Sequence, residues 1–374
     1  MNILFAAGGT GGHINPALSV AQEIRTRCPD ARLLFVGTKD KMEATLVPKA
    51  GFDFDTIDVT GFQRSFAPAD ILYNLGTLRR LLFVTGRCKK IIAAFQPDVA
   101  VGFGGYVSGP VLRTAHQMGV KIALHEQNAF PGKTNIALSR YADSVMLTYP
   151  GAADHLKSRT EPVITGLPVR TEILTADREA ARKKLGIPAD RFMVLSTGGS
   201  LGAEAINRVM CEVIPANLGG KLIFVHGCGQ SGKWVFDKLK EKGVDPDNTP
   251  GLTVSEYIYD MATYMAAADL VISRAGASSL AEIQALGKAA VMIPYPYAAE
   301  NHQFYNAKAL ADQDAGIVIE QKDLTAEKLQ AILDDLLSDP GKYERMGRNA
   351  RAMAKSDAQK RIADIVLSLA NSLT

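Results

Sequence analysis

Short apolar runs alternate with helix-like segments along the whole chain. In the first half the strand-like runs cover residues 3–6, 33–36, 99–102, 122–124, 144–147 and 163–164. In the second half they cover residues 193–196, 222–226, 253–255, 270–273 and 290–293. These runs are rich in valine, isoleucine and leucine, which is typical of parallel strands buried on both faces. The pattern therefore predicts an α/β fold with doubly wound parallel sheets.

The chain is expected to form two domains of this kind. Its length of 374 residues exceeds the range in which a single hydrophobic core keeps growing. A glycine–proline break at residues 166–169 follows the last strand-like run of the first half. We therefore predict an N-terminal domain over residues 1–166 and a C-terminal domain over residues 167–355. The helical end of the chain, residues 356–374, is expected to pack back on the first domain.

One motif occurs in both halves. The run at residues 3–6 leads into GGTGGH, and the run at residues 193–196 leads into GGSLGA. Each glycine turn precedes a helical pattern. Glycines let the backbone come close to a ligand, and a helix N-terminus presents unpaired N–H groups with partial positive charge. Two such loops predict two Rossmann-like domains that face one cleft, each able to hold a phosphate group.

The first loop is not a dinucleotide fingerprint. Its sequence is not G-x-G-x-x-G, and no acidic residue stands at the ribose-binding distance after the next strand. His13 lies at the mouth of the loop, and histidine titrates near neutral pH, which suits proton transfer. The alternative is a tight strand-to-helix turn with no ligand.

Two further motifs are rejected as sites. Residues 227–234 nearly spell a P-loop, but Trp234 stands where serine or threonine must bind magnesium, so we expect only a loop near the cleft. Asp53 and Asp55 match D-x-D, but two acids on an amphipathic strand are more often solvated surface. No metal site is predicted.

Polar residues follow several of the predicted strands. A small-residue turn after Ser273 opens a helix at about Ser278, and Glu282, one turn in, can accept hydrogen bonds from sugar hydroxyls. The alternative is a capped helix in which Glu282 is a first-turn acid. The clusters HEQN at residues 125–128 and ENHQFYN at residues 300–306 also follow strands, where ligands of open α/β sheets bind.

A basic apolar segment covers residues 71–90. No acid occurs between Asp70 and Asp98, and arginine and lysine are interleaved with apolar residues. This composition suits a surface that lies on anionic lipid headgroups. The alternative is a core helix whose basic residues form its wet face. The predicted membrane patch comprises Ile71, Leu72, Leu75, Leu78, Arg79, Arg80, Leu82 and Phe83.

Composition narrows the class of protein. A net charge of +3 does not indicate a nucleic-acid partner. The four cysteines lie far apart, so they are expected to be reduced thiols in a cytosolic protein and not a zinc site. A signal peptide is not expected, because the apolar N-terminal run lacks basic residues before it and soon reaches glycines, and no uncharged apolar run reaches the ~18 residues that span a bilayer. The protein is therefore expected to be intracellular, with peripheral membrane contact at most.

The chain resembles the MurG family of bacterial peptidoglycan glycosyltransferases (glycosyltransferase family 28) over essentially its whole length. The resemblance rests on the motifs GGTGGH, GFGGYVSGP, HEQN, TGLPVR, TGGSLGA, SRAGASSLAE and ENHQFYNA. It implies a GT-B fold and an inverting transfer of N-acetylglucosamine from UDP-N-acetylglucosamine. The implied acceptor is the C4 hydroxyl of undecaprenyl-diphospho-N-acetylmuramoyl-pentapeptide (lipid I), and the product is lipid II.

The same resemblance implies a place in the cell. It predicts a peripheral protein at the cytoplasmic side of an anionic cell membrane, acting in cell-wall biogenesis and thereby in cell shape and division. Other cell-wall synthesis proteins are expected partners, and nucleic acid is not. It also favours the membrane interpretation of residues 71–90. No tightly bound cofactor is implied; a divalent cation would at most stimulate, because no motif requires one.

Motif matching also assigns the donor site. The residues that match the family's UDP-N-acetylglucosamine site are Thr10, Gly11, Gly12, Asn128, Arg170, Ser200, Ile258, Ala277, Ser278, Ser279, Leu280, Ala281, Glu282 and Gln303. Arg170 and Ser200 are expected at the UDP phosphates, and the backbone of Ile258 at uracil. Glu282 is expected at the ribose hydroxyls, and Gln303 at the sugar.

Two residues compete for the role of catalytic base. His13 is preferred because its ordinary pKa range suits proton transfer. Glu126 is the second choice, and it could instead orient the acceptor or His13. The chain departs from the family at His302, where some relatives carry a second glutamine, so only Gln303 is carried over.

The sequence leaves three alternatives to lipid II synthesis. A glycosyltransferase of the same fold that makes glycolipids from diacylglycerol shares the loops and the membrane segment. A nucleotide-binding oxidoreductase with two Rossmann domains is disfavoured by the missing fingerprint. A non-catalytic sugar-nucleotide sensor would show binding without turnover.

Overall fold

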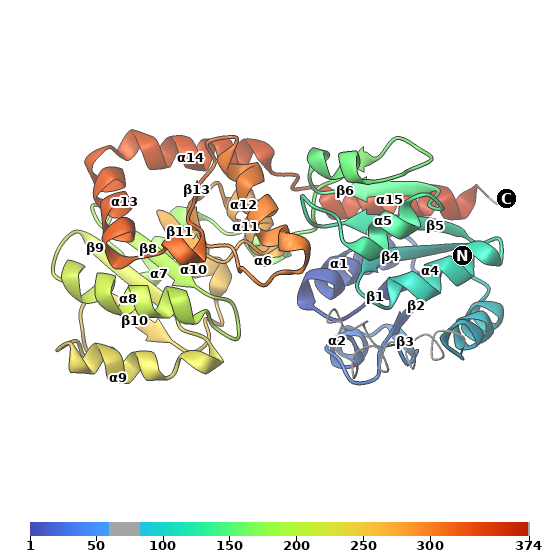
Figure 1. Cartoon of the computed structure of the whole chain (residues 1–374), viewed down its shortest axis with the longest axis horizontal. Coiled ribbons are helices and arrows are strands. Elements are labelled where there is room, and N and C mark those ends of the chain that lie inside the picture. Colours follow the sequence, from blue (N-terminus) through green and yellow to red (C-terminus); the bar gives the residue numbers. More distant parts are fainter. Residues whose placement is uncertain (60–82, 373–374) are drawn as a thin grey trace. The chain divides into compact units, whose positions relative to one another are not determined.

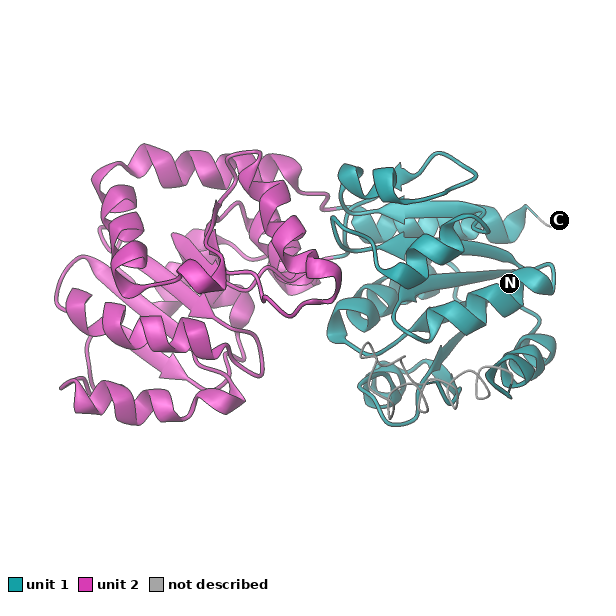
Figure 2. Cartoon of the chain, in the orientation of Figure 1, with its two compact units in different colours: residues 1–168, 357–374 teal, residues 169–356 magenta. Residues whose placement is uncertain are grey.

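The computed structural model describes residues 1–59 and 83–372. These residues form two compact units, which Figure 2 colours separately. Unit 1 comprises residues 1–168 and 357–374, and unit 2 comprises residues 169–356. The division between Pro168 and Val169 falls in the glycine–proline break. Each unit has its own parallel sheet and its own buried core.

Unit 1 is built around a parallel sheet (Figure 1). Its strands in the described residues are β1 (Asn2–Ala7), β2 (Arg32–Gly37), β3 (Asp53–Thr56), β4 (Val99–Gly104), β5 (Lys121–Glu126), β6 (Ser144–Leu147) and β7 (Val163–Ile164). They lie in the order β3-β2-β1-β4-β5-β6-β7, and the paired neighbours run parallel. The predicted parallel sheet is therefore confirmed for this half of the chain.

Helices cover both faces of the unit 1 sheet. They are α1 (Gly11–Arg27), α2 (Glu43–Lys49), α4 (Ser108–Gln117), α5 (Lys133–Ser139) and α15 (Ala358–Asn371), with the 3-10 turn η1 (Pro150–His155), and residues 83–95 are also helical. Ile3 belongs to the core cluster that contains α1 and α15, whereas its neighbour Leu4 belongs to the cluster under α4 and residues 83–95. Successive side chains of a strand point to opposite faces, so the sheet is doubly wound.

Unit 2 repeats this organisation. Its strands are β8 (Phe192–Thr197), β9 (Leu222–Gly227), β10 (Leu252–Ser255), β11 (Leu270–Ser273), β12 (Ala289–Met292) and β13 (Ile317–Val318), in the order β10-β9-β8-β11-β12-β13 with parallel neighbours. Its helices are α6 (Thr171–Leu174), α7 (Arg178–Leu185), α8 (Glu204–Asn217), α9 (Trp234–Glu241), α10 (Met261–Ala267), α11 (Ala277–Leu286), α12 (His302–Ala311), α13 (Ala326–Ser338) and α14 (Pro340–Met353). The 3-10 turns are η2 (Gln230–Gly232), η3 (Ala299–Asn301) and η4 (Gln321–Asp323).

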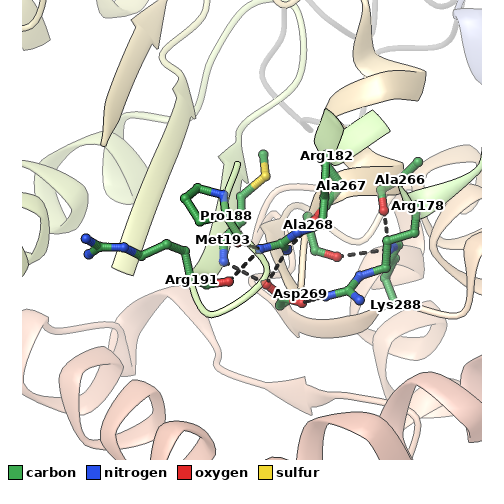
Figure 3. A network of polar contacts seen from close by, with 10 residues as sticks. All are labelled: Arg178, Arg182, Pro188, Arg191, Met193, Ala266, Ala267, Ala268, Asp269 and Lys288. Carbon is green, nitrogen blue, oxygen red and sulfur yellow. Dashed lines mark hydrogen bonds and ion pairs between the residues drawn. The ribbon is translucent and has the colours of Figure 1, made fainter. Parts of the chain in front are cut away.

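A buried charged network lies at the amino ends of the unit 2 strands (Figure 3). Asp269, just before β11, accepts hydrogen bonds from Arg182 (3.0 Å), from the backbone N–H of Met193 (2.8 Å) and from Arg178. Lys288, just before β12, donates to two backbone carbonyls at the end of α10. Because the buried charges of Arg182, Asp269 and Lys288 are hydrogen-bonded, the network holds α7 and α10 to the amino ends of the strands, opposite the glycine loop.

The strand order creates a topological switch point in each sheet. In unit 1 the switch lies between β1 and β4, and in unit 2 it lies between β8 and β11. Ligands of open α/β sheets bind beyond the carboxyl ends of strands at such a point. The two glycine loops follow β1 and β8, so each lies at the switch point of its own unit. Each unit therefore has one candidate ligand site.

Candidate active site

The candidate site of unit 1 begins with the glycine loop between β1 and α1. Gly8 is buried, whereas Gly9 (φ +89°) and Thr10 are exposed. Thr10 is the N-cap residue of α1, and in the described structure its side chain makes no capping hydrogen bond. The first turn of α1 contains no acidic residue. The positive end of the helix dipole is therefore not offset by an acid of its own first turn, which favours an anionic ligand there.

His13 is held against this loop by its δ nitrogen. Nδ1 lies 3.1 Å from the Gly8 carbonyl oxygen and 3.3 Å from Thr10 Oγ1. A carbonyl oxygen only accepts hydrogen bonds, so Nδ1 must be the donor in the Gly8 contact. The neutral ring then carries its basic lone pair on Nε2. That side of the ring packs against Gly104 (φ +100°), where an added Cβ would lie 3.1 Å from Nε2.

Glu126, at the end of β5, is buried, and both of its carboxylate oxygens accept hydrogen bonds. Its Oε1 accepts hydrogen bonds from the backbone N–H (2.9 Å) and side-chain amide (3.1 Å) of Asn128. Its Oε2 accepts from the Gly132 N–H (3.1 Å) and the Asn135 amide (2.8 Å). Burial raises the pKa of Glu126, and these donors oppose the rise. The carboxylate therefore fixes the loop that carries Asn128.

The second glycine loop, between β8 and α8, packs directly on the segment that resembles a P-loop. Backbone N–H groups of Gln230 and Ser231 donate to the carbonyls of Ser200 (3.1 Å) and Leu201 (3.1 Å). A Cβ at Gly202 (φ +89°) would overlap the Cys228 carbonyl oxygen. The GCGQSGK segment thus supports the glycine loop, and the loop holds Ser200 exposed at the end of β8.

The N-terminus of α11 forms a second anion-compatible position in unit 2. Its N-cap residue is Gly276, which has no side chain to accept from the first N–H groups of the helix. The first turn contains no acidic residue. Glu282 lies further along the helix, so it is not the first-turn acid of the alternative interpretation. Its Oε1 accepts a hydrogen bond from Arg170 Nε at 2.8 Å, with side-chain exposures of 13% and 49%. Burial raises the pKa of Glu282, and Arg170 opposes the rise.

Gln303, in α12, links two strand ends. Its Oε1 accepts from the backbone N–H of Ala275 (3.2 Å), after β11, and of Tyr295 (2.9 Å), after β12. Its neighbour His302 donates from Nδ1 to the Ala299 carbonyl at 2.8 Å. Ile258 follows β10 and buries its side chain against Gly227. The predicted uracil contact of Ile258 involves its backbone, which this packing fixes in place.

The structure therefore gathers the predicted site residues into two groups. In unit 1, Thr10 ends the glycine loop, Gly11, Gly12 and His13 form the first turn of α1, and Glu126 and Asn128 lie at the carboxyl end of β5. In unit 2, the residues beyond the carboxyl ends of the strands are Arg170, Ser200, Ile258, Ala277, Ser278, Ser279, Leu280, Ala281, Glu282 and Gln303.

The predicted membrane patch lies almost wholly outside the described residues. This holds for its residues from Ile71 to Leu82, whereas Phe83 is described and is 72% exposed. Over the described ranges no helix is long and apolar enough to cross a membrane. Within the same ranges no cluster of three or more candidate ligands could hold a metal, and Asp55 is ion-paired with Arg87.

Sequence patterns missed three contributors to these sites. Glu43, in α2, accepts a hydrogen bond from Gly9 of the first loop. Asn135 completes the shell of donors around Glu126. The segment at residues 227–231 supports the second loop. Only the last had a local signal: its glycine spacing is interpreted as a loop near the cleft, and its contact with the second glycine loop is not predicted.

Comparison with known proteins identifies the family. The glycosyltransferase family 28 N-terminal domain matches residues 3–147, and the family 28 C-terminal domain matches residues 193–362. Enzymes named UDP-N-acetylglucosamine–N-acetylmuramyl-(pentapeptide) pyrophosphoryl-undecaprenol N-acetylglucosamine transferase are similar over the whole chain. That of Desulforudis audaxviator is 42% identical, covering 100% of both chains, and that of Thermoanaerobacter sp. is 42% identical, covering 99% of this chain and 100% of its own.

A solved structure agrees with these relatives. The crystal structure of Acinetobacter baumannii MurG has a TM-score of 0.80 and 30% identity, covering 98% of this chain and 99% of its own. The GT-B fold and the recognition made from the motifs are thereby confirmed. The chain belongs to glycosyltransferase family 28, and within it to the UDP-N-acetylglucosamine–N-acetylmuramyl-(pentapeptide) pyrophosphoryl-undecaprenol N-acetylglucosamine transferases, a family of hexosyltransferases.

Proposed function

We propose that this chain transfers N-acetylglucosamine from UDP-N-acetylglucosamine to the C4 hydroxyl of lipid I and so makes lipid II. The observation that carries the proposal is the 42% identity, over the full length of both chains, to transferases named for this reaction. Both substrates carry a diphosphate, and each unit has a glycine loop and a helix N-terminus that suit an anion.

Unit 2 is the proposed donor domain. Ser200 and the N-terminus of α11 would contact the diphosphate through hydroxyl and backbone N–H groups. Glu282 would accept from the ribose hydroxyls, and Arg170, now paired with it, would turn to the phosphates. As the bond to the sugar breaks, the charge that develops on UDP would be stabilised by Ser200, by the N–H groups of α11 and by Arg170 once it has turned. The Gln303 amide would reach the sugar.

Unit 1 is the proposed acceptor domain, with His13 as catalytic base. The reaction must remove the proton of the C4 hydroxyl while the oxygen attacks the anomeric carbon. His13 donates from Nδ1, so Nε2 carries the lone pair that can take this proton. Glu126 already accepts four hydrogen bonds, which suits a role in holding Asn128. One-step displacement inverts the α linkage of the donor to β.

The reaction is tested by product formation. The purified protein is incubated with labelled UDP-N-acetylglucosamine and lipid I, and lipid II is separated by chromatography. Parallel reactions contain UDP-glucose or UDP-galactose with diacylglycerol, which test the glycolipid alternative. Label in lipid II supports the proposal, whereas label only in a diacylglycerol product would overturn it.

His13 is tested by substitution. His13→Ala should lower turnover by a factor of about 100 or more, in the range typical of a lost general base, while UDP affinity stays unchanged. His116→Ala is the matched control, because His116 lies in the last turn of α4, away from the carboxyl ends of the strands. Normal turnover in His13→Ala would rule out His13 as the base.

We also infer peripheral attachment to anionic membrane through residues 71–83. The inference is supported by Arg79 and Arg80 among the apolar residues of this segment, by its lack of acidic residues and by the exposure of Phe83. Cosedimentation with vesicles tests it. Binding to phosphatidylglycerol vesicles that is lost at high salt supports the inference, and equal binding to neutral vesicles would contradict it.

A further inference from the structure

A fully buried carboxylate lies beneath the first glycine loop. Glu43, the first residue of α2, has no exposed surface. Its Oε2 accepts a hydrogen bond from the Gly9 N–H at 3.1 Å. Its Oε1 accepts from the backbone N–H of Thr38 at 3.0 Å and from the Thr38 hydroxyl at 2.8 Å. All of these partners are donors, which is the set that an ionised carboxylate takes.

The same loop peptide contacts both Glu43 and His13. The N–H of Gly9 and the C=O of Gly8 belong to one peptide group. Glu43 accepts from the N–H of that group, and His13 Nδ1 donates to its carbonyl oxygen at 3.1 Å. The carboxylate, the peptide group and the imidazole therefore form one continuous chain of hydrogen bonds.

Glycines make room for this arrangement. A Cβ at Gly8 would lie 2.6 Å from Glu43 Oε1, and a Cβ at Gly37 would lie 2.5 Å from Glu43 Cγ. A Cβ at Gly105 (φ +82°) would overlap the Gly8 carbonyl oxygen. Larger residues at these positions would displace the carboxylate or the peptide group. The position of Glu43 thus depends on the missing side chains of Gly8 and Gly37, and the position of the Gly8 carbonyl on that of Gly105.

We propose that Glu43 is a positioning residue for catalysis: its carboxylate polarises the Gly8–Gly9 peptide group, which holds His13 with its proton on Nδ1. A hydrogen-bonded chain that ends in a negative charge strengthens the acceptor at its other end. The Gly8 carbonyl therefore binds the Nδ1–H more strongly and stabilises the ring when it becomes positively charged. This inference rests on the proposed role of His13 as the base.

In the proposed transfer step, the proton of the C4 hydroxyl moves to His13 Nε2 while the hydroxyl oxygen forms a bond to the anomeric carbon. The bond between that carbon and the UDP oxygen breaks, and UDP leaves with the electron pair. Glu43 takes no proton, and its negative charge acts on the imidazolium through the peptide group.

The tautomer of His13 is the direct readout. The protein is labelled with ¹⁵N-histidine, and the signal of His13, one of six histidines, is assigned by its loss in His13→Ala. In the wild type, above the titration range, Nδ1 should show the shift of a protonated nitrogen and Nε2 that of an unprotonated one. The reverse pattern in the wild type would overturn the proposal without any variant.

Variants then test the carboxylate. Glu43→Gln should shift the ring toward a mixture of tautomers and lower kcat about tenfold or more, which is a part of the roughly 10²–10⁴-fold contribution of a general base, with an unchanged KM for UDP-N-acetylglucosamine. Thr38→Val is the matched control, because it removes a donor to Glu43 but keeps the carboxylate and its Gly9 contact. It should retain the wild-type tautomer and kcat within a few-fold. An equal loss of kcat in both variants, or no change in Glu43→Gln, would overturn the proposal.

These outcomes separate the inference from the proposed function. If His13→Ala is inactive but Glu43→Gln keeps the wild-type tautomer and kcat, only the role of Glu43 fails. If His13→Ala keeps its turnover, the base assignment and the role of Glu43 both fail, although lipid II synthesis itself stands on the product assay.

Discussion

Glu282 and Arg170 form an ion pair in the structure. Both are proposed to bind UDP, and without a ligand each is the charged partner of the other. Glu282 is nearly buried, and burial raises its pKa, whereas Arg170 is half exposed. An exposed arginine gains little from an ion pair, because water solvates it well. The pair can therefore open at small cost when ribose hydroxyls and phosphates offer replacement partners. Until then Arg170 keeps the buried carboxylate from being unpaired.

Glu282→Gln should weaken UDP binding. The variant loses charge-assisted hydrogen bonds, each worth roughly 1.5–3 kcal/mol, so we expect the Kd for UDP to rise about tenfold or more. Isothermal titration calorimetry measures the Kd. Glu172→Gln is the matched control, because Glu172 is an exposed acid in α6 next to Arg170. An unchanged Kd in Glu282→Gln would show that Glu282 does not contact the nucleoside.

At the scale of elements, local apolar patterns predicted most of the strands of each sheet. The runs at residues 144–147 and 270–273 match β6 and β11, because buried parallel strands leave a continuous apolar signal. β3 was not among those runs, since Asp53 and Asp55 interrupt its apolar pattern, and β13 is only two residues long. α1 begins at Gly11, inside the glycine-rich motif, and the sequence pattern does not reveal this start because glycines obscure helical periodicity.

The candidate sites were predictable only in part. The glycine loops follow from local sequence, because each comes directly after its strand, whereas their position at a switch point depends on the order of the strands. The contact between Glu43 and Gly9 joins residues 34 positions apart, and that between Arg170 and Glu282 joins residues 112 apart. Such pairings are set by the order of strands in the sheet, which one sequence does not encode as a repeating pattern.

Gly202→Ala should disable the second glycine loop. Its Cβ would overlap the Cys228 carbonyl oxygen, and its φ of +89° is costly for alanine, so the loop must shift. We expect UDP affinity to fall about tenfold or more, corresponding to about 1.4 kcal/mol. Gly199→Ala is the matched control: it has a similar φ of +85°, but its Cβ would meet no described atom within 4 Å. Equal effects of the two variants on UDP binding would contradict the role of loop-to-loop packing.

At the scale of the whole molecule, buried ionisable groups in each unit link stability to pH. His125 in unit 1 and His226 in unit 2 are fully buried, and burial lowers the pKa of each to about 4. Between about pH 4 and 6.5 the unfolded chain therefore binds protons that the native chain does not, so acid favours unfolding. Glu126 and Glu282 act in the opposite direction, because burial raises their pKa values. Lys288, with a pKa lowered to about 8, acts only at alkaline pH.

His226→Asn isolates one of these contributions. His226 Nδ1 pairs with Ser196 Oγ at 2.8 Å, and its Nε2 has no hydrogen-bond partner among the described residues. The variant cannot take up the proton, so acidification from pH 6.5 should cost it less stability than the wild type, by up to about 1.4 kcal/mol per pH unit. The single tryptophan, Trp234, lies in unit 2, so urea unfolding followed by its fluorescence reports this unit.

Ser196→Ala distinguishes burial from hydrogen bonding as the cause. Burial alone lowers the pKa of His226, so a variant that keeps the histidine but loses the hydroxyl should lose stability with acid as steeply as the wild type. Because the wild type and both variants share every other titrating group, the carboxylates that act in the opposite direction cancel from the comparison. The difference in slope between His226→Asn and the other two proteins then belongs to the buried imidazole. Equal slopes in all three proteins would mean that His226 takes up its proton equally in the native and unfolded states, so that burial does not lower its pKa, and that unit 2 loses stability in acid for another reason.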